Sequence, residues 1–182
     1  MNRVFIVAVP DEINFQTKLF GDEIIISGVG KINAAMAACR AINKGYKEVI
    51  NIGSCGSLSL PSGTIVKVGR VFQDIDVTPL IDYGKTPFED DLSEIILDPN
   101  EIISCFTTDY FYDASQKSKY SKKYLKMLEK HTIFDMEVYA IAKVCYKYHV
   151  KFTSYKWVSD NGDGHNWKEN CKVNFEKLKN II

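Results

Sequence analysis

Short apolar runs of strand length alternate with segments of helical periodicity, and this alternation most constrains the fold. The expected strands are Val4–Val9, Glu23–Ser27, Glu48–Ile52, Thr64–Phe72 and Phe152–Val158. The expected helices are Lys31–Asn43, Lys119–Lys130, Val138–Tyr148 and Phe175–Ile182. Strands that alternate with helices favour a parallel or mixed sheet covered on both faces. We therefore predict one α/β domain over residues 1–182, a three-layer α/β/α unit whose central mixed sheet is mostly parallel.

Charge and cysteine content exclude several classes of protein. Lysine plus arginine and aspartate plus glutamate number 23 each, so no basic surplus points to nucleic acid. The five cysteines are odd in number and form no CxxC pair, which favours a reducing cytoplasm over a disulfide framework or zinc site. The N-terminus lacks signal-peptide architecture, and no apolar run approaches the ~20 residues of a membrane helix. The expectation is a cytoplasmic protein with neither nucleic-acid nor membrane partners.

Two expected strands are followed by glycine-rich segments. Gly28-Val29-Gly30-Lys31 lacks the spacing of a Walker A motif and of GxGxxG, so on its own it indicates a tight strand-to-helix turn. The segment Gly53–Ser57 offers backbone N–H groups and two hydroxyls, which can hold an anion, a ribose or a water. A simple turn explains this second segment equally well. It does not match the Gly-x-Ser-x-Gly nucleophile elbow.

Acidic residues stand at the starts and ends of the expected elements. Met136-Glu137 opens one expected helix, and Asp160 closes the last expected strand. Ligands of open α/β sheets bind outside the carboxyl ends of the strands. An aspartate there can act as a general acid, and a glutamate can accept two hydrogen bonds from a sugar diol. This combination suits cleavage of a bond between a base and a ribose. Glu12 follows the first strand, where it can take a proton from water or favour a helix N-terminus.

Other polar and aromatic segments have a stronger structural explanation. Asp74–Thr78 has no third ligand at suitable spacing and indicates a turn or interface element, so no metal site is expected. Tyr110-Phe111-Tyr112 can stack on a planar base or belong to the core. The three histidines have no catalytic motif around them and are expected in surface or loop positions. Residues 79–101 are expected to form a long loop.

Taken together, these segments resemble the nucleoside phosphorylase family, with the 5'-methylthioadenosine/S-adenosylhomocysteine nucleosidases as the most similar branch. The resemblance rests on the GVGKxNAA turn, the GSCG segment, the DxDVT stretch and the MEXXAIAXVC helix, which occur in the family's order. It implies the family's α/β fold and cleavage of a purine nucleoside without a metal or organic cofactor. The chain looks like a shortened member, expected to lack a hairpin between Phe15 and Glu23 and most of a helix between Pro87 and Thr107.

The resemblance implies a role for each matching position. Asp160 resembles the acid that protonates the purine, with Asp163 as a competitor for that role, and Glu12 resembles the base that activates water. Glu137 resembles the ligand of the ribose 2'- and 3'-hydroxyls, with Met136 under the sugar. The remaining expected contacts to water, base or sugar are Ser54, Cys55, Gly56, Phe111, Tyr112 and Lys156, the last standing where the nucleosidases have an arginine.

The nucleophile can also be predicted from the resemblance. In the bacterial phosphorylases an arginine stands two residues before the first glycine of GSCG, where this chain has Asn51. Only three arginines exist in the chain, and none lies in a matching phosphate motif. We therefore expect hydrolysis, with a phosphate-dependent phosphorylase and a non-catalytic nucleoside-binding protein as alternatives. The family often pairs subunits, with the DxDVT-to-Tyr83 region near the partner's active site. Asp76–Tyr83 retains that pattern, so a homodimer is expected.

Overall fold

The computed structural model describes residues 2–89, 93–164 and 167–182. Within them the strands form one ten-stranded mixed sheet, with the order β2-β3-β1-β4-β9-β8-β6-β7 and with β10 paired to β4 and β5. The strands are β1 (Arg3–Val7), β2 (Lys18–Leu19), β3 (Asp22–Ile26), β4 (Glu48–Gly56), β5 (Ile65–Lys67), β6 (Arg70–Gln73), β7 (Ile95–Ile96), β8 (Ser104–Thr107), β9 (Ile133–Asp135) and β10 (Lys151–Asp160).

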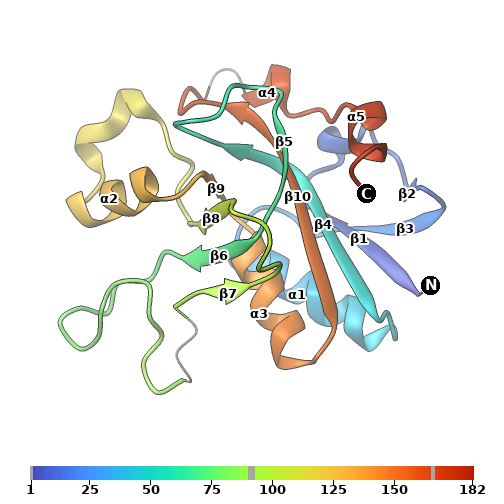
Figure 1. Cartoon of the computed structure of the whole chain (residues 1–182), viewed down its shortest axis with the longest axis horizontal. Coiled ribbons are helices and arrows are strands. Elements are labelled where there is room, and N and C mark those ends of the chain that lie inside the picture. The colour runs from blue at the N-terminus through green and yellow to red at the C-terminus, as the bar shows by residue number, and fades with distance from the viewer. Residues whose placement is uncertain (1, 90–92, 165–166) are drawn as a thin grey trace.

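The longest strand pairings are parallel, as predicted. Strand β1 pairs in parallel with β3 and β4, and β4 pairs in parallel with β10 along nearly its whole length. Figure 1 shows β4 and β10 crossing the centre of the molecule side by side. Antiparallel partners extend this unit, among them β2 beside β3 and β5 beside β10. The carboxyl ends of β1, β4 and β10 therefore meet at one edge of the sheet.

Helices cover both faces of the sheet. They are α1 (Lys31–Asn43), α2 (Lys122–Lys130), α3 (Val138–Lys147), α4 (Trp167–Asn170) and α5 (Phe175–Lys179), with 3₁₀ helices η1 (Pro10–Ile13) and η2 (Ala114–Lys119). Figure 1 shows α1 and α3 together on one side of the sheet, where the small alanine side chains of α1 let the two helices approach β1 and β4 closely. The other face packs against η1 and α5. No helix among the described residues has the length and apolar character needed to span a bilayer.

The structure corrects several expected element bounds. Strand β4 continues through the GSCG segment, because Trp157, Val158 and Asp160 of β10 pair with it there, so the expected turn is strand. The expected strand Thr64–Phe72 is two strands, because the chain changes partners at Gly69. A Cβ at Gly69 would lie 2.1 Å from the Glu101 carbonyl oxygen, so this crossing requires glycine.

Further differences between the expected and the observed elements concern shorter segments. The expected helix Lys119–Lys130 begins only at Lys122, where the Ser121 hydroxyl caps it by accepting from the Tyr124 N–H at 3.1 Å. The segment between Phe15 and Glu23 contains a short hairpin, since β2 pairs with β3. Strand β7 lies inside the expected long loop.

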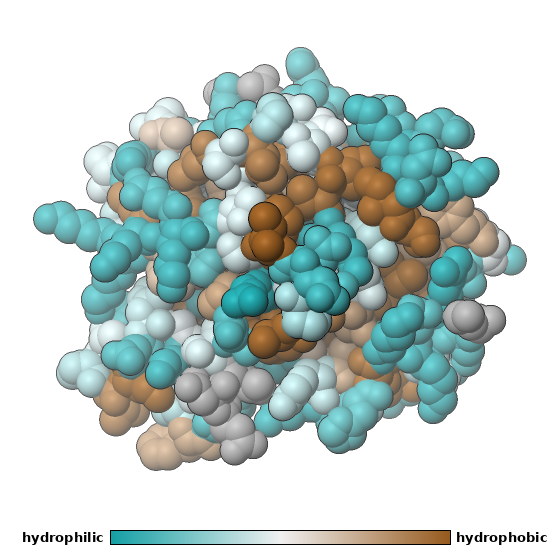
Figure 2. All heavy atoms as spheres, in the orientation of Figure 1, coloured by the Kyte–Doolittle hydropathy of each residue, from teal (hydrophilic) through white to brown (hydrophobic). Residues whose placement is uncertain are grey.

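The face of the molecule in Figure 2 is mostly hydrophilic, with hydrophobic residues gathered in patches near its centre and upper right.

Candidate active site

A cavity of about 280 Å³ opens at the edge where the parallel strands end. Its wall is contributed by the last residues of β4, β9 and β10 and by the segments that follow β1, β3, β8, β9 and β10. Nine of the residues predicted from the sequence line this one cavity: Glu12, Ser54, Cys55, Gly56, Phe111, Tyr112, Met136, Glu137 and Asp160. The structure thus brings together acids, hydroxyls and aromatic rings that lie up to about 150 residues apart in the chain.

Glu12 is buried in η1 and bound by the end of β4. Its Oε1 accepts hydrogen bonds from the Ser54 backbone N–H and from the Ser54 hydroxyl, both at 2.7 Å. Its Oε2 lies 3.4 Å from the Val9 backbone N–H. Burial raises the pKa of Glu12 above its ordinary value, while Lys156 and the Ser54 hydrogen bonds act against that rise. A carboxylate held in this way is suited to accept a proton from water.

Glu137 lies at the start of α3, opposite the turn that opens α1. Its Oε1 accepts from the Gly30 backbone N–H at 2.9 Å. Gly30 has a φ of 95°, a backbone conformation that residues other than glycine rarely adopt. In this conformation the GVGK turn presents the Gly30 N–H to the Glu137 carboxylate. Burial raises the pKa of Glu137 to about 7. Its carboxyl group lines the cavity and can accept hydrogen bonds from neighbouring hydroxyls.

Asp160 ends β10 on another wall of the cavity. Its Oδ2 accepts from the Ser159 hydroxyl at 2.8 Å, and its Oδ1 accepts from the Gly162 backbone N–H at 3.0 Å. Burial raises the pKa of Asp160 above its ordinary value, which favours the protonated form that a general acid requires. Asp163 is exposed and does not line the cavity, so the placement favours Asp160 over Asp163 as the acid.

Lys156 takes a different place from the one expected of a substrate-binding residue. It is buried beneath the cavity and does not line it. Its Nζ lies 2.9 Å from Asp135 Oδ2 and 4.0 Å from Glu137 Oε2. The expectation of direct contact with substrate is therefore not supported by the structure. The lysine instead compensates charge among the carboxylates that support the cavity.

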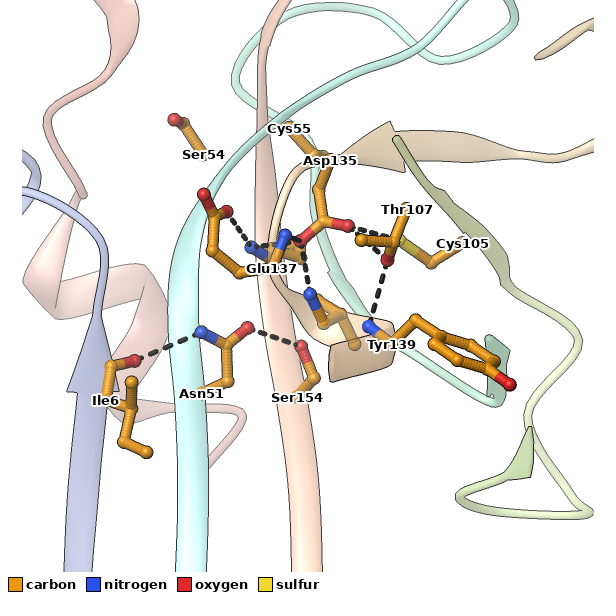
Figure 3. Close-up of polar contacts among 12 residues, drawn as sticks. Ile6, Asn51, Ser54, Cys55, Cys105, Thr107, Asp135, Glu137, Tyr139 and Ser154 are labelled. Atoms are coloured by element: carbon orange, nitrogen blue, oxygen red, sulfur yellow. Dashed lines mark hydrogen bonds and ion pairs between the residues drawn. The ribbon is translucent and has the colours of Figure 1, made fainter. Parts of the chain in front are cut away.

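Asp135 is the centre of this buried network, and no role was predicted for it from the sequence. Its Oδ1 accepts from the Thr107 hydroxyl at 2.7 Å, and its Oδ2 accepts from the Val138 backbone N–H at 2.9 Å, so it binds the first N–H of α3 (Figure 3). Below it, Asn51 Nδ2 donates to the Ile6 carbonyl oxygen at 3.1 Å. Asn51 thus links neighbouring strands rather than facing a ligand, which explains its burial.

Aromatic rings form the remaining wall. The Phe111 ring is half exposed at the cavity, whereas Tyr112 is buried against Phe134 in an edge-to-face contact. Trp167, in the short helix α4, also lines the cavity and stands perpendicular to Phe111 with ring centroids 6.4 Å apart. Trp167 was not predicted from the sequence, because it follows a glycine-rich loop with no motif or periodicity around it.

Other candidate groups lie elsewhere. His131 was expected at the surface or in a loop, but it is buried and lies against Phe72 with ring centroids 4.1 Å apart. His149 is exposed after α3, and His165 lies outside the described residues. Among the residues that the structure describes, no group of three or more His, Cys, Asp or Glu side chains is arranged to hold a metal ion.

The sequence matches the Phosphorylase superfamily over residues 8–182. The chain belongs to this superfamily. A 5'-methylthioadenosine/S-adenosylhomocysteine nucleosidase of Bacillus thuringiensis is 32% identical over 171 residues, covering 79% of this chain and 70% of that protein. The protein of the same name from Listeria innocua is 28% identical, covering 79% and 71%. These relatives confirm the resemblance predicted from the sequence motifs.

Solved structures of the superfamily show the same fold. The nucleosidase of Neisseria meningitidis, in complex with methylthio-immucillin-A, has a TM-score of 0.75 and 22% identity, covering 94% of this chain and 92% of that one. The futalosine hydrolase of Helicobacter pylori has a TM-score of 0.78 and 19% identity, covering 99% and 97%. The predicted α/β fold with a mixed sheet is therefore confirmed.

Proposed function

We propose that this superfamily member hydrolyses the N-glycosidic bond of a purine nucleoside of the adenosine type, with a 5'-methylthio or 5'-homocysteinyl substituent as the favoured form. The observation that carries the proposal is the convergence of three buried carboxyl groups, Glu12, Glu137 and Asp160, on one cavity. The relatives named 5'-methylthioadenosine/S-adenosylhomocysteine nucleosidase support the substrate class. No metal or organic cofactor takes part in the proposed reaction.

Each carboxyl group has a part in this reaction. Glu12 takes a proton from a water, and the water oxygen forms a bond to C1' of the ribose. The bond between C1' and N9 breaks, its electron pair goes to the purine, and Asp160 delivers a proton to N7. Glu137 accepts hydrogen bonds from the ribose 2'- and 3'-hydroxyls, and its negative charge stabilises the positive charge that develops on the sugar. The products are a free purine, available for salvage, and the ribose moiety.

The nearby side chains support this assignment. Phe111 stacks on the purine, Tyr112 presents its backbone to the purine edge, and Met136 packs under the sugar. Ser54, Cys55 and Gly56 hold the water and the sugar. Lys156 acts indirectly, since it contacts the carboxylates rather than the cavity.

The cavity wall favours water over phosphate as the nucleophile. Of the described residues that line it, none is an arginine or a lysine. A phosphorylase needs cations to bind phosphate, usually as charge-assisted hydrogen bonds. Lys31, which stands nearby in the GVGK turn, forms an ion pair with Asp109 at 2.9 Å and donates to the Asp74 carbonyl oxygen at 2.8 Å.

A homodimer and a cytoplasmic location are further parts of the proposal. Ile32 and Met36 lie one turn apart on α1 and are 78% and 66% exposed, and Val29, which precedes α1 in the chain, lines the cavity. Large apolar side chains that gather at the surface mark interaction sites, and a second copy of the chain is the occupant we propose. The five cysteines are free thiols, which supports a reducing compartment.

The test is release of free base from methylthioadenosine, S-adenosylhomocysteine, adenosine and inosine, with and without phosphate. We expect release that needs no phosphate and that falls at least about 100-fold in Asp160→Asn, because the acid is lost. Asp163→Asn, which removes the exposed acid three residues later, is the matched control and should retain activity. Strict phosphate dependence would instead indicate the phosphorylase, and binding without turnover would indicate a nucleoside-binding protein.

A further inference from the structure

Trp167 lines the cavity, and the reaction above gives it no task. Its indole Nε1–H donates to Ser54 Oγ at 3.0 Å. The Ser54 hydroxyl in turn donates to Glu12 Oε1 at 2.7 Å. Three residues from η1, β4 and α4 thus form one chain of hydrogen bonds that ends on the carboxylate proposed to activate water.

The direction of this chain is fixed by the donors available. An indole N–H can only donate, whereas a serine hydroxyl has one proton and can also accept. Because Ser54 Oγ accepts from Trp167, its own proton remains free to point at Glu12. Hydrogen bonds linked in this way polarise one another, so the bond to Glu12 is stronger than a serine alone would make.

The segment that carries Trp167 is anchored directly to Glu12 and to the sheet. The Val173 backbone N–H donates to the Glu12 carbonyl oxygen at 2.9 Å. The buried Trp157 of β10 donates its indole N–H to the Cys171 carbonyl oxygen at 2.9 Å. These two bonds set the position of α4 relative to η1, so Trp167 reaches Ser54 from a supported backbone.

We propose that Trp167 is a positioning residue that directs the Ser54 hydroxyl toward Glu12 and thereby holds Glu12 as the base for the attacking water. This inference rests on the proposed hydrolysis. It assigns Trp167 a polar role in addition to its edge-to-face contact with Phe111 in the cavity wall. The two roles separate experimentally, because phenylalanine keeps a ring and lacks the N–H.

Several other groups influence the protonation of Glu12 besides the Trp167–Ser54 bond. The positive charge of Lys156 favours the ionised carboxylate. Glu137, Cys55 and Cys171 also interact with it electrostatically, from α3, β4 and the segment after α4. All of them remain in place when Trp167 is changed to phenylalanine, so a change in the protonation of Glu12 reports on the Trp167–Ser54 bond.

The experiment is a double-mutant cycle on kcat/KM with Trp167→Phe, Ser54→Ala and both together. A hydrogen bond of this kind corresponds to about a threefold to tenfold effect, so we expect that loss from Trp167→Phe in the wild-type background. In the Ser54→Ala background the same change should cost less than about twofold, because the hydroxyl through which it acts is gone. An equal loss in both backgrounds would overturn the proposal and would leave Trp167 only a packing role in the lining of the cavity.

The pH profile separates a positioning role from a merely structural one. Glu12 must be ionised to accept a proton. Without the Trp167 indole N–H to direct it, the Ser54 hydroxyl donates less to Glu12, so the acid limb of kcat/KM should move upward by about half a pH unit to one pH unit. Asp163→Asn, which changes an exposed acid outside the cavity wall, is the control that should leave this limb in place. An unmoved limb in Trp167→Phe would contradict the proposal. Absence of base release by the wild type, by contrast, would refute the proposed hydrolysis itself.

Discussion

The Nζ of Lys156 lies 2.9 Å from Oδ2 of Asp135, with 2% and 1% of the two side chains exposed. Burial alone would raise the pKa of Asp135, but the Lys156 charge and the hydrogen bonds to the carboxylate hold that pKa below its ordinary value. Asp135 also accepts from the first backbone N–H of α3, directly after Glu137, so this buried pair supports the segment that carries Glu137 to the cavity.

Lys156→Met should destabilise the fold strongly. The substitution leaves the buried Asp135 carboxylate without its cation, and a broken buried pair typically costs about 3–5 kcal/mol. Urea denaturation at pH 7 measures the loss. The matched variant is Lys156→Met combined with Asp135→Asn, which removes both charges and should recover part of the stability. If Lys156→Met costs less than about 1 kcal/mol, the two charges are not coupled as the structure indicates.

The protonation of Glu137 should make stability depend on pH. Its folded pKa of about 7 exceeds the ordinary glutamate value of 4.5, so the folded state binds the proton more tightly than the unfolded state. The resulting stabilisation is fully present below pH 4.5 and is lost as pH rises through about 7. Other groups titrate as well, so the difference between wild type and Glu137→Gln isolates this contribution.

Denaturation curves of both proteins from pH 5 to 8 test the sign. We expect the wild type to lose stability relative to Glu137→Gln as pH rises, with the difference levelling off above the folded pKa. A difference that stays constant over this range would show that Glu137 is ionised throughout. A depressed folded pKa would also leave the difference nearly constant here, because its contribution to stability changes only below about pH 4.5.

The exposed apolar face of α1 should control subunit association. Ile32→Glu places a charge in the proposed interface, where it would be buried without a partner, so we expect a monomer at concentrations where the wild type is a dimer. Ile102, which is 87% exposed and belongs to the loop before β8, gives the control variant Ile102→Glu. Sedimentation equilibrium distinguishes them. Equal masses for both variants and the wild type would place any interface elsewhere.

Local chemistry explains which parts of the fold could be predicted from the sequence. The bounds of α1 were predicted correctly because alanine-rich periodicity and the preceding glycine turn agree. Strand β9 was missed because its three residues give too short a pattern, and β4 was ended too early because glycine and serine usually mark turns. Pairing with β10 overrides that local preference.

The residues of the site divide in the same way, into those that local sequence features predict and those whose contacts depend on long-range packing. Glu12, Glu137 and Asp160 were predicted because each stands at a strand or helix end, where the topology of an α/β sheet gathers them. The contacts of Lys156 and Trp167 depend on tertiary packing between distant segments, so spacing along the chain carries no sign of them. Their placement became evident only from the structure.

Alanine substitutions at two glycines of β4 should distinguish an effect on the shape of the cavity from an effect on the position of the Glu12 carboxylate. A Cβ at Gly56 would lie 2.1 Å from the Phe134 ring, so Gly56→Ala forces that ring to move and should cost about 1–3 kcal/mol of stability. A Cβ at Gly53 would lie 3.2 Å from Glu12 Oε1 and 3.3 Å from Lys156 Nζ. The Gly53→Ala methyl therefore meets only the ends of two side chains, and it displaces the carboxylate more than the backbone.

We accordingly expect Gly53→Ala to lose activity out of proportion to stability, and Gly56→Ala to lose both. Thermal unfolding and base release, measured on the same preparations, test this contrast. A general base must lie within hydrogen-bond reach of the water, so in Gly53→Ala a shift of a few tenths of an ångström in Glu12 lowers kcat while the core stays packed. If Gly53→Ala retains full activity, the position of the Glu12 carboxylate does not limit the reaction, and the base must be sought elsewhere in the cavity.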